Sequence, residues 1–72
     1  MAELPVVTPR EAIRALEKGG FERARQRGSH VILKREDRRV TVPFHRKDLA
    51  KGTLRQIIRD AGMTVDEFVS LL

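Results

Sequence analysis

The residues best suited to chemistry are Gly28-Ser29-His30, which place a histidine at the first position of an apolar strand. A histidine has an unperturbed pKa of about 6.5, so it can accept and donate protons near neutral pH. Gly28 has no side chain and lets a ligand approach the backbone closely, and Ser29 adds a hydroxyl donor. The triplet indicates a proton-transfer site; the alternative is an ordinary surface histidine at the edge of a hairpin.

Basic side chains beside the triplet indicate what it acts on. Arg23, Arg25 and Arg27 alternate along the preceding segment, so in a regular strand with Ala24 pointing inward they all point outward. RNA carries its own nucleophile, the 2′-hydroxyl, so its cleavage needs only a base, an acid and charge stabilisation. We therefore expect His30 and this basic face to cleave RNA without a metal, the alternative being a solvated basic surface.

Further candidates lie later in the chain. His45 follows the third expected strand, where a loop can bring it back over the sheet as a second acid or base; the alternative is a histidine that only packs in the loop. Lys34, Lys51 and Arg55 are candidate RNA contacts. Lys51 also precedes a helix whose free amides can bind an anion, with Thr53 as a plain N-cap the alternative.

Composition limits the class of protein. The 72 residues predict one small domain spanning 1–72, and the absence of cysteine leaves aliphatic side chains to form its core. The net charge of +5 favours a polyanionic or acidic partner. Neither a metal nor another cofactor is expected, and three phenylalanines without tryptophan or tyrosine disfavour an aromatic base-stacking platform. No signal peptide or membrane-length apolar run is seen, which predicts a cytoplasmic protein.

The expected elements run helix, three strands, helix, with a short helix after them. Thr8 and Glu11 form a capping box for a helix over residues 9–18, which Gly19-Gly20 ends. Strands over 21–27, 30–35 and 40–42, joined by short polar turns, predict an antiparallel meander. A helical apolar pattern over 54–61 ends at Gly62, and Thr64 with Glu67 opens the last helix.

The strand pattern also predicts the two faces of the sheet. Alternation places Val31, Leu33, Val40 and Val42 on the buried face, and His30, Ile32, Lys34, Arg39 and Thr41 on the opposite face. Ile32 is the apolar exception on that polar face. It is either ordinary exposed surface or part of a protein-binding patch. Arg35, Arg38 and Arg39 flank a tight turn and are expected to aid solubility or to contact phosphate loosely.

Four segments together resemble the HicA toxin family: Gly20-Phe21, residues 25–30, residues 40–45 and residues 51–64. The resemblance implies an mRNA interferase with a double-stranded-RNA-binding-domain-like αβββα fold, an α+β class. It implies that His30 is the catalytic residue and that a HicB-type antitoxin covers the site. The chain departs from the family pattern at Glu22-Arg23-Ala24-Arg25, which is unusually basic and leaves Ala24 as the clear core residue of its strand.

From this resemblance we expect the antitoxin to cover His30 and Ile32 and to present carboxylates to the three arginines of the first strand. Two other functions use the same basic face. One is a non-catalytic module that binds double-stranded or structured RNA by shape. The other is a protein-interaction domain that does not contact nucleic acid. Salt-dependent RNA binding separates the last from the others, and cleavage separates the enzyme from the RNA-binding module.

Overall fold

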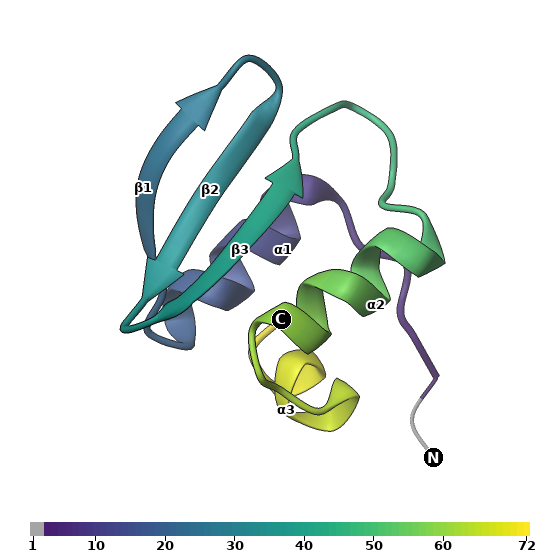
Figure 1. The fold of residues 1–72 in the computed structure, drawn as a ribbon. Coiled ribbons are helices and arrows are strands. Elements are labelled where there is room, and N and C mark those ends of the chain that lie inside the picture. The colour runs from purple at the N-terminus through teal and green to yellow at the C-terminus, as the bar shows by residue number, and fades with distance from the viewer. Residues whose placement is uncertain (1–2) are drawn as a thin grey trace.

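The computed structural model describes residues 3–72 and has the expected order of elements. These are α1 (Pro9–Lys18), β1 (Glu22–Arg27), β2 (His30–Arg35), β3 (Arg38–Pro43), α2 (Lys51–Asp60) and α3 (Val65–Ser70). The strands form one antiparallel sheet in the order β1-β2-β3 (Figure 1). The expected α+β fold with an additional C-terminal helix is confirmed. No helix formed by the described residues is long and apolar enough to cross a membrane.

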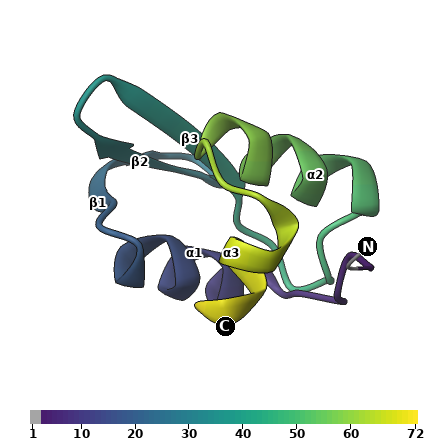
Figure 2. The ribbon, with the colours of Figure 1, turned by 90° about the horizontal axis from the view of Figure 1, so that it is seen from below.

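The helices pack against one face of the sheet. Figure 2 shows α1 and α3 on one side of the strands and α2 alongside β3. As expected, Val31, Leu33, Val40 and Val42 point to this side and are at most 1% exposed. They join a single apolar cluster with helix residues such as Leu16, Leu54 and Phe68. The opposite face of the sheet, which we call the outer face, is not covered by any described helix.

Two capping boxes fix where α1 and α3 begin. The Thr8 backbone N–H donates to the Glu11 carboxylate at 2.9 Å, and the Glu11 N–H donates to the Thr8 hydroxyl at 3.1 Å. Thr64 and Glu67 repeat the arrangement at 2.8 and 3.1 Å. The backbone hydrogen bonds, followed by those from the threonine side chains, lower the pKa of both glutamates. The caps therefore stabilise the fold while these carboxylates are ionised, and this stabilisation is lost as the pH falls through the lowered pKa values.

The start of α2 is fixed differently, and the alternative that Thr53 is its N-cap is wrong. The N-cap is Ala50, which has no side chain that could accept a hydrogen bond, and Thr53 lies inside the first turn. Just before it, buried Leu49 donates its backbone N–H to the carbonyl of Val7 at 2.8 Å. A tertiary contact with the N-terminal segment thus positions α2, and the apolar pattern of the helix does not report it. Residues 1 and 2 lie outside the described part of the chain.

The first strand departs from regular alternation. Arg23 pairs with Leu33 and Arg25 pairs with Ile32, so Ala24 is the extra residue of a β-bulge. Ala24 is exposed, like all of β1, and the expectation that it belongs to the core is wrong. β1 is an edge strand with little helix beneath it, so no apolar contact enforces a regular period of two.

Two arginines beside the second turn contact the ends of helices. The Arg35 guanidinium donates to the carbonyl of Gly19, just after α1, at 2.6 Å, and lies 4.9 Å from the centre of the Phe21 ring. Arg38 donates to the carbonyl of Asp60, the last residue of α2, at 3.4 Å. Cations at helix C-termini are stabilising because they satisfy free carbonyls and oppose the helix dipole. Arg35 and Arg38 therefore join the sheet to the helices, a structural role that their sequence positions did not indicate; their part in solubility or phosphate contact stays a prediction.

Glu36 provides a test of the second turn, because it is the one described non-glycine residue with positive φ, at 56°. Left-handed backbone costs a side-chain-bearing residue about 1 kcal/mol. We expect Glu36→Gly to raise the free energy of unfolding by about 0.5 kcal/mol once the greater flexibility of the unfolded chain is included. Asp37→Gly, at the neighbouring position without positive φ, should lower it. Urea denaturation of both variants checks this, and equal effects at the two positions would contradict it.

Candidate functional site

His30 lies at the start of the middle strand, held between its two neighbours. It pairs with Arg27 across the β1–β2 turn and with Pro43 at the end of β3. The backbone N–H of Phe44 donates to the carbonyl of Ser29, which ties the turn to the chain leaving β3. The side chain of His30 is exposed and points to the outer face. An exposed imidazole is thus presented from a strand end that both neighbouring strands fix in place.

Arg25 and Arg27 share the outer face with His30. Arg27 is directly opposite His30, and Arg25 is opposite Ile32, two pairs further along the strands on the same face. Side chains opposite each other in an antiparallel pair have Cβ atoms about 5 Å apart, and diagonal neighbours are about 7 Å apart. Long guanidinium groups at these distances can reach an anion that touches the imidazole. We call His30, Arg25 and Arg27 the His30 cluster.

Gly28 and Ser29 form the two-residue turn before His30. Gly28 has φ of 57°, and a Cβ atom placed on it would meet nothing within 4 Å. Glycine is favoured there because the first central residue of such a hairpin turn has left-handed backbone, while the space around it is open. Ser29 is exposed beside His30, where its hydroxyl can donate to the same ligand.

The structure separates the other expected basic residues from the His30 cluster. The bulge at Ala24 moves Arg23 to the helix side of β1, so the expectation that it points outward with Arg25 and Arg27 is wrong. Lys34 does lie on the outer face, but four residues along β2 from His30, about 13 Å at 3.3 Å per residue. Its neighbours in the sheet are Glu22 and Arg39.

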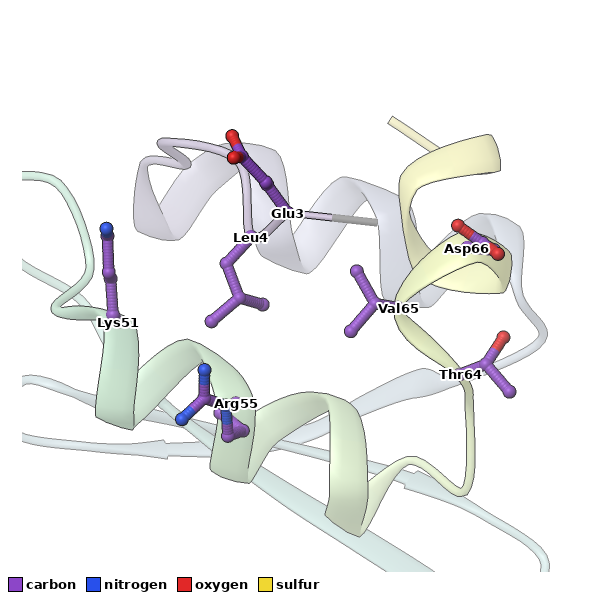
Figure 3. A pocket seen from close by; sticks show the side chains of 7 residues that line it. All are labelled: Glu3, Leu4, Lys51, Arg55, Thr64, Val65 and Asp66. Atoms are coloured by element: carbon purple, nitrogen blue, oxygen red, sulfur yellow. The ribbon is translucent and has the colours of Figure 1, made fainter. Parts of the chain in front are cut away.

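Lys51 and Arg55 line a hollow that belongs to the helices. Its other lining residues come from the N-terminal segment and the start of α3: Glu3, Leu4, Thr64, Val65 and Asp66 (Figure 3). In Figure 1 α2 begins at the right edge of the molecule, separated from the β1–β2 turn by β3 and the loop that follows it. The two carboxylates of this hollow offset its two cations, so it is not an extension of the basic outer face.

His45 lies at the same end of the sheet as His30, but it borders a hollow next to α1. It follows Phe44, whose backbone binds Ser29, and lines a hollow beside the start of α1 with Thr8, Pro9, Arg10, Phe44 and Arg46. The loop after β3 thus directs it toward the helix side. The arrangement does not bring the two imidazoles together on the outer face.

Ile32 is covered, although it lies on the outer face and outside the main apolar cluster. It is only 5% exposed, between Arg25 on β1 and Thr41 on β3. The middle strand is flanked on both sides, and the aliphatic stems of long polar side chains readily cover an apolar neighbour. The expectation that Ile32 is an exposed anchor for a protein partner is therefore wrong.

The burial of Ile32 changes what substitution should do. We expect Ile32→Asp to lower the free energy of unfolding by about 3 kcal/mol, because it removes a buried apolar side chain and places a charged group at a covered position. Thr41→Asp, at the exposed neighbouring position, should cost less than about 1 kcal/mol. Chemical denaturation of both variants tests this, and a fully stable Ile32→Asp protein would show that the position tolerates water.

Arginines that sequence reasoning passed over accompany Arg23. Arg10 and Arg14 of α1 line a hollow with Arg23, and Ile13, Glu17 and Phe44 complete its lining. The signal for the first two was their spacing of four residues, which places them on one face of the helix. Arg39, which is expected to aid solubility or to contact phosphate loosely, lies on the outer face and adds to its positive charge.

Comparison with known families gives a match over most of the chain. The model for the HicA toxin of bacterial toxin-antitoxin systems matches residues 9–63, which contain α1, the whole sheet and α2. The matched segment includes the His30 cluster and the arginines of α1. No match was found among curated proteins.

Proposed function

The chain belongs to the HicA toxin family of toxin–antitoxin systems, and from that premise we propose that it is an endoribonuclease, an mRNA interferase, that cleaves RNA by histidine acid–base catalysis. The observation that carries this proposal is the His30 cluster: an exposed imidazole at a fixed strand end, with two arginines beside it. A proton-transfer group among phosphate-binding side chains is what RNA cleavage through the 2′-hydroxyl requires.

In the proposed reaction, a base removes the proton of a 2′-hydroxyl and the oxygen attacks the adjacent phosphorus. The bond from phosphorus to the 5′-oxygen breaks, and an acid protonates that oxygen. The products are a 2′,3′-cyclic phosphate and a free 5′-hydroxyl. His30 acts as the base or the acid, while Arg25, Arg27 and the Ser29 hydroxyl stabilise the negative charge that develops on the phosphate oxygens.

We also propose that a HicB-type antitoxin inhibits the protein by covering the outer face. That face carries four cationic side chains, Arg25, Arg27, Lys34 and Arg39, against one carboxylate, Glu22. Such a surface attracts an acidic partner as well as RNA. The antitoxin must recognise polar side chains there, since Ile32 is buried.

The first test is His30→Ala. We expect the loss of the proton-transfer group to reduce the rate of RNA cleavage by about 100-fold or more, with little change in stability because the side chain is exposed. Cleavage of a labelled transcript and a thermal melt of the same preparation measure both. Partial recovery on adding imidazole would support proton transfer. A folded variant that cleaves like wild type would remove His30 from the mechanism, and a wild-type protein that binds RNA without cleaving it would indicate a binding module instead.

His45 is proposed as a secondary contributor. Because it borders the hollow beside α1, we expect His45→Ala to reduce cleavage by less than about tenfold, well below the effect of His30→Ala. The pH–rate profiles of wild type and variant provide the decisive measurement. Loss of one limb of the profile would identify His45 as the second acid or base, contrary to this expectation.

A further inference from the structure

A second basic surface lies on the helix side of the sheet, next to the edge strand β1. Arg10 and Arg14 of α1 line it together with Arg23, which the bulge at Ala24 directs to the helix side. Glu17 is the one carboxylate in its lining, so positive charge dominates. We call this hollow the α1–β1 groove.

The arginines of the α1–β1 groove are available to a ligand. All three are exposed, and none donates a hydrogen bond from its guanidinium group to another group within residues 3–72. The guanidinium groups of Arg35 and Arg38, by contrast, donate hydrogen bonds to carbonyls at helix C-termini. Free guanidinium groups match phosphate oxygens in charge and geometry, so the groove favours a chain of phosphates.

Phe44 connects the α1–β1 groove with the candidate catalytic triplet. Its ring is partly buried against the core and lines both this groove and the neighbouring hollow that holds His45. Its backbone N–H binds the carbonyl of Ser29, one residue before His30. The composition disfavours a platform of several aromatic rings, but a single ring beside free arginines can still bind single-stranded nucleic acid, through stacking of one base and contacts to phosphates.

We propose that the α1–β1 groove binds the nucleotides next to the cleaved phosphate of a single-stranded RNA. Arg10, Arg14 and Arg23 contact its phosphates, and Phe44 stacks on one base. The strand is unpaired there, because a base within a duplex has both faces covered by its neighbours. This inference rests on the proposed ribonuclease function and extends its substrate site from the outer face around the edge of β1.

RNA binding by proteins carrying His30→Ala, which are not expected to cleave, tests the phosphate contacts. The probe is a short fluorescein-labelled single-stranded RNA, followed by fluorescence anisotropy. We expect Arg14→Gln or Arg23→Gln to weaken binding about fivefold each and to reduce the slope of log affinity against log salt by about 0.7. Arg59→Gln is the matched control: it removes one exposed positive charge from α2, away from the groove, and should change affinity by less than about twofold.

Phe44→Leu tests stacking, since leucine preserves apolar packing against the core but removes the ring. We expect it to weaken binding of the same RNA about fivefold and to abolish the fluorescence change of a 2-aminopurine base placed beside the cleavage position. A thermal melt controls for folding. A duplex of the same sequence should bind less tightly than the single strand.

Several outcomes would overturn the groove proposal. Affinity and salt slope unchanged in Arg14→Gln and Arg23→Gln would do so, as would a duplex binding as tightly as the single strand. Loss of affinity for the antitoxin alone would assign the groove to that protein instead. If the wild-type protein does not cleave RNA but the groove variants bind RNA more weakly than their parent protein, the ribonuclease proposal is wrong and the groove proposal is supported. If wild type cleaves and the variants bind normally, the groove proposal falls by itself.

Discussion

The structure depends on one constraint: the described helices all pack on the same side of the three-stranded sheet. The apolar side chains of β2 and β3, apart from Ile32, therefore point to the helix layer, where they form the core with α1, α2 and α3. The alternate residues of β2 point to the outer face, where they contact water or neighbouring side chains of the same face. His30 is exposed for this reason, and its neighbours are polar for the same reason.

The elements with complete local signals could be predicted from sequence. The capping boxes at Thr8 and Thr64 contain both partners within four residues, so they fix the start of α1 and α3 without tertiary information. The alternation in β2 and β3 is strong enough to give the correct faces. The family resemblance likewise rested on contiguous segments, and the matched residues 9–63 include all but the last of them in full.

Features that depend on distant contacts could not be read in the same way. The residue pattern of β1 does not predict the bulge at Ala24, because neither face of this edge strand is buried. The start of α2 depends on a bond between Leu49 and Val7, far apart in the chain. The arginines illustrate the same limit, since one residue type joins helices to the sheet at Arg35 and stays free at Arg23. Only the three-dimensional neighbours distinguish these roles.

The position of β1 at the edge of the sheet also affects self-association. An edge strand exposes unpaired backbone groups that can pair with the same strand of another copy. Here Arg23, Arg25 and Arg27 repel such a copy, and the bulge disturbs the straight edge it would need. A polyanion that neutralises these arginines removes the repulsion. Self-association of the protein and occupancy of the proposed RNA-binding surface are therefore expected to be coupled through the same side chains.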